Sequence, residues 1–113
     1  MDDSVELLRV LGNKFSAEIL QAADEPKSAQ ELSDELDIPI ATSYRRIEEL
    51  TDAELLELQG KEFSDEGRRT QVYRRNVETI RIEFGEGTIE FRIEERPEVS
   101  DALADVWEQL GKR

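Results

Sequence analysis

Residues 28–52 read SAQELSDELDIPIATSYRRIEELTD, and this stretch decides the fold of the chain. Ser28 and Glu31 have the spacing of a capping box, in which the hydroxyl and the carboxylate each accept a backbone N–H at a helix start. Pro39 ends the helix that begins there, because the residue before a proline avoids the helical conformation. A second helix then extends to about Asp52, and its inner side is expected to carry Ile40, Ser43, Ile47 and Leu50.

The short connection from Asp37 to Pro39 joins these two helices into a helix-turn-helix unit. Upstream of it, the apolar spacing predicts short helices over residues 4–11, with Ser4 as the cap, and over residues 14–23. Downstream, residues 55–63 and 70–76 have strand character on either side of the turn residues SDEG, which predicts a β-hairpin. A helix-turn-helix followed directly by a hairpin is the winged arrangement.

Beyond position 76 the sequence predicts a second hairpin and a last helix. A two-residue loop at Glu86 and Gly87 pairs Phe84 with Ile89 and keeps the apolar residues of 77–94 on one side. Residues 98–110 then carry apolar residues at helical spacing. The expected fold class is α+β: a winged helix-turn-helix over residues 1–76, with a β-hairpin and a C-terminal helix over 77–113 in the same compact unit.

The composition narrows the classes of function. The chain has no Cys and no His, so we expect no disulfide, no metal site and no cofactor. No apolar run is long enough to cross a membrane and the sequence begins without a signal peptide, which predicts a cytoplasmic protein. Carboxylate pairs can support acid–base catalysis, but acidic residues are so abundant here that chance pairs are expected, and we expect no enzyme.

The net charge of −13 argues at first against a nucleic-acid partner. The charge is uneven, however, since residues 1–39 carry 3 basic and 10 acidic side chains while residues 40–75 carry 7 and 8. Within this second part, residues 67–75 hold four arginines and no acid. Because phosphate binding depends on local charge, this segment is a candidate DNA contact.

Three stretches of the chain resemble a known family: LGNKFSAEIL at 11–20, ELSDELDIPIATSYRRIEELTDAELLE at 31–57 and GRRTQVYRR at 67–75. Their order and spacing are similar to the winged helix domains of ArsR-type and related archaeal transcriptional regulators. The resemblance covers about 60% of the chain and implies DNA binding. The Cys and His ligands of the metal-sensing members are absent, so metal sensing does not carry over. The excess of acids, with eleven Arg against four Lys, also resembles salt-adapted haloarchaeal proteins.

Three residues depart from the pattern of that family. Asp37 stands where glycine is usual at the turn between the helices, and Asp is among the better substitutes in a left-handed conformation. Ser43 replaces the usual valine and is expected to weaken the packed face of the second helix. Glu54 replaces the glycine of the family's AGLL motif.

These features predict a sequence-specific transcriptional regulator that docks its second helix in the major groove of double-stranded DNA. Arg45 is the candidate for guanine, whose two acceptors fit a guanidinium group. The alternative for this helix is a solvated face with Arg45–Glu49 and Arg46–Glu49 ion pairs. The arginines of the hairpin are expected on phosphates or in the minor groove, with only one of Arg74 and Arg75 facing DNA. The predicted DNA-binding residues are Ala41, Thr42, Tyr44, Arg45, Arg46, Arg68, Arg69 and Arg74.

The C-terminal apolar stripe predicts a homodimer, because an amphipathic helix at a chain end often completes a symmetric pair. The alternative is that the stripe covers the core of its own chain. Its residues are Val99, Leu103, Val106, Trp107 and Leu110. A second function also stays open, namely a winged helix that binds proteins in a transcription or replication assembly without direct DNA contact. Ser43 and the overall acidity favour that alternative, whereas the arginines of residues 67–75 favour DNA.

Overall fold

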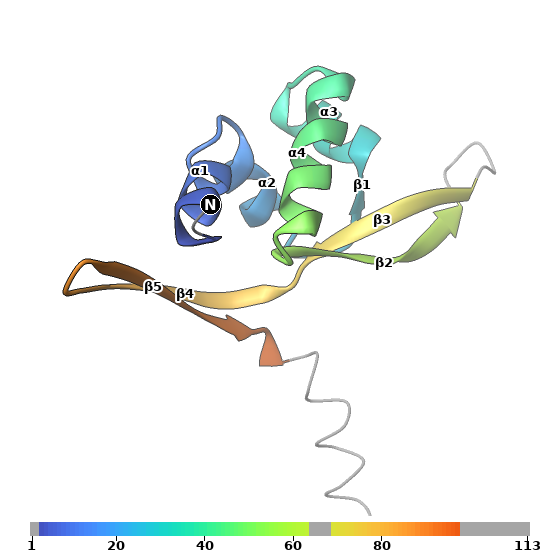
Figure 1. The fold of residues 1–113 in the computed structure, drawn as a ribbon. Coiled ribbons are helices and arrows are strands. Elements are labelled where there is room, and N and C mark those ends of the chain that lie inside the picture. Colours follow the sequence, from blue (N-terminus) through green and yellow to red (C-terminus); the bar gives the residue numbers. More distant parts are fainter. Residues whose placement is uncertain (1–2, 64–68, 98–113) are drawn as a thin grey trace, which may run out of the picture. The chain divides into compact units, whose positions relative to one another are not determined.

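The computed structural model describes residues 3–63 and 69–97 of the chain. Its contacts divide the chain into two compact units, Met1–Arg75 and Asn76–Arg113. The first unit combines four helices with a three-stranded antiparallel sheet, and the second contains a two-stranded antiparallel sheet (Figure 1). The first unit has the element order of a winged helix-turn-helix.

The first two helices are α1 (Asp3–Leu11) and α2 (Ser16–Ala22). Ser4 lies inside α1 and is therefore not its cap, which corrects the expected start of this helix by one residue. The second helix was expected from residue 14, but it begins two residues later. Phe15 adopts a left-handed conformation with φ 77°, which interrupts the helical backbone directly before Ser16.

The helices α3 (Ala29–Leu36) and α4 (Ile40–Asp52) lie side by side and form the helix-turn-helix unit (Figure 1). The predicted capping box is confirmed: the Glu31 N–H donates to Ser28 Oγ at 3.1 Å and the Ser28 N–H donates to Glu31 Oε1 at 3.0 Å. Asp37 ends α3 in the left-handed conformation, with φ 55° and ψ 51°. Pro39 directly precedes α4, as its restriction on the preceding residue requires.

The core of this unit lies where the helices meet the sheet, and the side chains of Ile19, Leu32, Leu50 and Leu55 are completely buried. Ser43 is completely buried as well, and its hydroxyl donates to the Ala29 carbonyl oxygen at 2.9 Å. This bond ties α4 to the first residue of α3. The expectation of a simply weakened apolar face therefore missed a polar contact between the helices.

The sheet of the first unit has the order β1-β3-β2 and is antiparallel throughout. Its strands are β1 (Lys27–Ser28), β2 (Leu56–Phe63) and β3 (Arg69–Arg75). The hairpin of β2 and β3 was expected, whereas the two-residue strand β1 was not. The Arg75 N–H donates to the Ala23 carbonyl oxygen at 2.8 Å, so the last residue of β3 is bonded to the C-cap of α2.

The second unit consists of β4 (Val77–Gly85) and β5 (Thr88–Glu95). Phe84 lies opposite Ile89 and Ile82 lies opposite Phe91, so the apolar residues share one face. That face is open in part, since Phe84 is 77% exposed. The predicted C-terminal helix and its stripe lie outside the described residues. Within the described ranges, no helix is long and apolar enough to span a membrane.

Candidate nucleic-acid interface

The first turns of α4 present a mixed surface to solvent. Ala41, Tyr44 and Arg45 are exposed, and Thr42 is half-buried. The Tyr44 residue is 58% exposed. Pro39 occupies the N-cap position of α4, and its side chain cannot accept a hydrogen bond. The first N–H groups of the helix are therefore not capped by a side chain and can donate to a ligand. An uncapped helix start beside an exposed guanidinium suits an anionic partner.

Arg45 and Arg46 are neighbours in sequence but have different surroundings. Arg45 is exposed, and within residues 3–63 and 69–97 no side chain forms an ion pair with it. The Arg46 side chain is only 15% exposed, and its Nη1 donates to Glu49 Oε2 at 3.1 Å. Of the two ion pairs considered from the sequence for this helix, the structure contains the Arg46–Glu49 pair. Arg45 is the arginine left available at the surface.

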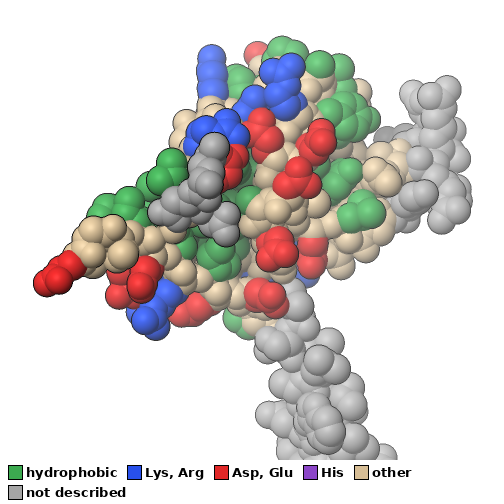
Figure 2. Space-filling model, in the orientation of Figure 1, with side chains coloured by type: hydrophobic (Ala, Val, Ile, Leu, Met, Phe, Trp, Pro, Cys, Tyr) green, Lys and Arg blue, Asp and Glu red, His purple; other side chains and the backbone are tan. Residues whose placement is uncertain are grey.

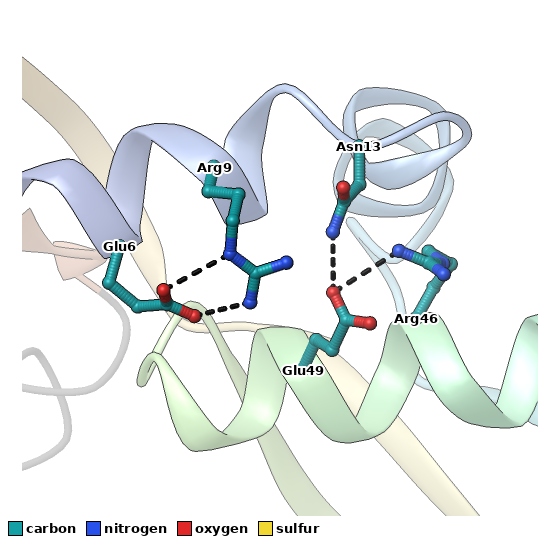
Figure 3. A network of polar contacts seen from close by, with 5 residues as sticks. All are labelled: Glu6, Arg9, Asn13, Arg46 and Glu49. Carbon is teal, nitrogen blue, oxygen red and sulfur yellow. Dashed lines mark hydrogen bonds and ion pairs between the residues drawn. The ribbon is translucent and has the colours of Figure 1, made fainter.

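Glu49 also connects α4 to the turn between α1 and α2, because its Oε2 accepts a second hydrogen bond from Asn13 Nδ2 at 2.5 Å (Figure 3). Glu6 and Arg9 form an ion pair beside this cluster at 2.5 Å. The hydrogen bond from Arg9 lowers the pKa of Glu6 and raises the pKa of Arg9, which the charge of Glu49 raises further. Glu49 therefore anchors the middle of α4 to the N-terminal helices.

The hairpin of β2 and β3 is the wing of this fold, and the structure describes only some of its arginines. Arg68 lies outside the described residues, and so does the side chain of Arg69, the first residue of β3. Arg74 is half-buried, and Arg75 Nη2 lies 3.3 Å from Asp24 Oδ1. The four arginines have no acid within their own segment, but Asp24 supplies one from elsewhere. Arg75 is thus paired with a carboxylate from the turn that follows α2.

An open groove of about 320 Å³ runs between α4 and β3. Its lining combines aromatic, aliphatic and acidic side chains from the two elements: Tyr44, Ile47, Glu48, Thr51, Asp52 and Tyr73. The carboxylates of Glu48 and Asp52 repel phosphate, so the C-terminal half of α4 is a poor DNA contact. Acidic side chains are also scattered over the face of the molecule seen in Figure 2. The surface of α4 that suits DNA is thus confined to its N-terminal half.

Ile40 is the one residue of this surface that the sequence analysis placed wrongly. It was expected on the inner side of α4 with Ser43, Ile47 and Leu50, which are buried. Instead, Ile40 is 38% exposed. It is the first residue of α4, directly after Pro39, and the first buried residue of the helix is Ser43. Its position after the proline was the only signal available in the sequence.

In the described part of the chain, no group of three or more Asp or Glu residues is placed to hold a metal ion. No curated protein matches the chain. Residues 6–59, from α1 into β2, match the model of a family described as a helix-turn-helix domain. The matched residues include α3 and α4, so the comparison agrees with the helix-turn-helix that these two helices form in the structure.

Proposed function

We propose that the protein is a sequence-specific transcriptional regulator that docks α4 in the major groove of double-stranded DNA. One observation carries this proposal: Arg45 is exposed and without an acidic partner in the described part of the chain, in the turns of α4 that face bases in such complexes. Its neighbour Arg46 is held by Glu49 at 3.1 Å. The helix therefore offers a single available guanidinium group, which suits recognition of one guanine through O6 and N7.

The remaining residues of α4 serve phosphates and neighbouring bases in this proposal. The backbone N–H of Ala41 lies in the uncapped first turn and is suited to a phosphate oxygen. Thr42 is half-buried and suited to a phosphate or a thymine methyl group, and Tyr44 extends into solvent. Arg46 is available to a flanking phosphate only where that phosphate replaces Glu49.

The wing adds contacts that do not depend on sequence. We assign Arg68, Arg69 and Arg74 to the phosphate backbone or the minor groove, where arginine is attracted by negative potential. The proposal is supported by the order of the elements, since the hairpin of β2 and β3 directly follows α4. Arg75 is not included, because it pairs with Asp24.

We further propose that the regulator is a homodimer held by the stripe of residues 99–110. A two-fold dimer places its two α4 helices about 34 Å apart, which matches half-sites one turn apart on DNA. The exposed apolar residues of the second hairpin, Ile82, Phe84 and Ile93, support an interface in this part of the chain. Their burial favours association through the hydrophobic effect.

A test of the function uses the full chain and a pool of random-sequence DNA duplexes. Retained duplexes are sequenced after repeated rounds of binding in molar salt and, separately, at low salt. Enrichment of a common sequence motif is the expected result, and genome-wide mapping of bound sites should return the same motif. The carboxylates of Glu48 and Asp52 favour the second candidate, a protein-binding winged helix, which predicts no enriched motif in either pool.

A further inference from the structure

Two large side chains are exposed next to each other at the start of α4. Ile40 is 38% exposed and Tyr44 is 58% exposed. They are four residues apart, so they are neighbours on one face of the helix. The buried residues of α4 are Ser43, Ile47 and Leu50, so both Ile40 and Tyr44 keep part of their side chains open to solvent. The start of α4 therefore presents an aliphatic and an aromatic side chain on the same helix turn as the exposed Arg45.

We propose that Ile40 and Tyr44 form an apolar contact that recognises the methyl group of thymine in the bound DNA. This inference rests on the proposed function and names the bases that α4 selects beside the guanine of Arg45. The C5 methyl group of thymine is the apolar group that the bases display in the major groove. A methyl group forms no hydrogen bond, so a polar side chain cannot recognise it. An aliphatic side chain that covers the methyl group removes apolar surface from water, which favours binding.

The spacing of the two residues fits successive bases. Four residues of helix span about 6 Å, at 1.5 Å per residue. Base pairs stack at about 3.4 Å, so Ile40 and Tyr44 lie about two base steps apart where the helix follows the groove. Arg45 directly follows Tyr44, so its guanine lies within the same few base pairs. The inference therefore predicts a binding site in which one or two thymines lie within a few base pairs of one guanine.

The test uses the DNA sequence that the full chain enriches from the random-sequence pool. This duplex is resynthesised with each thymine in turn replaced by uracil, which removes only the methyl group and keeps the base pair. We expect the affinity to fall about fourfold at one or two thymines, the value for one buried methyl group. The remaining thymines should be insensitive to the exchange.

Two variants assign the effect to the side chain. At one of the thymines where uracil weakens binding of the parent protein, Ile40→Ala should bind the thymine duplex and the uracil duplex equally well. Leu8→Ala is the matched control, because Leu8 is also an aliphatic residue on a helix and is 36% exposed, but lies on α1. This control should keep the full uracil effect. Thermal unfolding of both variants checks that they are folded. If Ile40→Ala does not fold, Ile40→Val takes its place, and it should reduce the uracil effect at the same position.

Three results would overturn the inference, in distinguishable ways. Enrichment of a motif with no uracil-sensitive thymine rejects methyl recognition and leaves the proposed function standing. A uracil effect that survives unchanged in Ile40→Ala rejects Ile40 as the contact. No enriched motif at all rejects the proposed function together with the inference, and then the exposed pair belongs to a protein-binding surface.

Discussion

Ser43→Ala tests how much the hydroxyl between the two central helices stabilises the fold. Its Oγ is completely buried and donates to the Ala29 carbonyl at 2.9 Å. A typical hydrogen bond contributes about 0.5–1.5 kcal/mol. The Ala29 carbonyl begins α3 and keeps its intrahelical bond, so the loss leaves no orphan acceptor. Alanine also returns a few tenths of a kcal/mol through its higher helix propensity.

The free energy of unfolding should therefore fall by about 0.5–1 kcal/mol, which lowers Tm by about 2–6 °C. Urea unfolding followed by circular dichroism measures the first quantity, and a thermal scan measures the second. Ser16→Ala is the matched control, because Ser16 is also completely buried in a helix but its Oγ has no hydrogen-bond partner among the described residues. This control should be neutral or slightly stabilising, since it removes a buried unsatisfied hydroxyl.

Ser43→Val completes the comparison, because valine is the residue that the family resemblance led us to expect. It removes the same hydrogen bond and adds volume at a site with no exposed surface, so it should cost about 1–3 kcal/mol. Equal stability of Ser43→Ala and the parent would show that the bond contributes nothing. A valine variant more stable than the parent would show that the serine weakens the packing after all.

Three further predictions concern function. Arg45→Ala should lower the affinity for the selected DNA site by about 1–3 kcal/mol and weaken the base preference at one position. Arg81→Ala, which changes an exposed arginine of the second unit, should leave both unchanged. An unchanged base preference of Arg45→Ala in repeated selections would remove Arg45 from base recognition. Arg68→Ala combined with Arg69→Ala should weaken binding to all duplexes alike and flatten the salt dependence by about 0.9 per lost phosphate contact; a salt titration identical to that of the parent contradicts this. Removal of residues 98–113 should give a monomer by light scattering, and a dimer that survives the truncation cannot be held by that segment.

The central part of the fold could be predicted because its signals are local. The capping box joins Ser28 and Glu31, which are three positions apart. The break between the helices depends on Pro39 and the residue before it. Strand β1 was missed because it has only two residues, and its partner in β3 lies more than forty positions away. No periodicity can be recognised in two residues, so such a strand exists only through its tertiary pairing.

The candidate site was predicted less completely, for two physical reasons. Helical periodicity assigns a face to each residue but does not say how far along the helix burial extends. Ile40 was therefore placed with the buried residues of α4, although it is 38% exposed. Arg45 and Arg46 are both within helical reach of Glu49, and the sequence does not say which of them pairs with it; in the structure Glu49 accepts from Arg46 and from Asn13. The tip of the wing and the C-terminal stripe lie outside the described residues, so their roles stay predictions.

Ser28 and Ala29 have a mechanical consequence for binding. Ser28 lies opposite Val72 of β3 and caps α3, and the next carbonyl, that of Ala29, accepts the hydroxyl of Ser43 on α4. Two consecutive residues thus join the strand that leads from the wing to the helix proposed to enter the groove. If α4 binds a duplex as proposed, these bonds hold β3 close to the same duplex. The wing then has a high effective concentration for its own contacts with the DNA. The losses of binding free energy caused by separate changes in α4 and in the wing should then not add up to the loss caused by both changes together, because each contact positions the other.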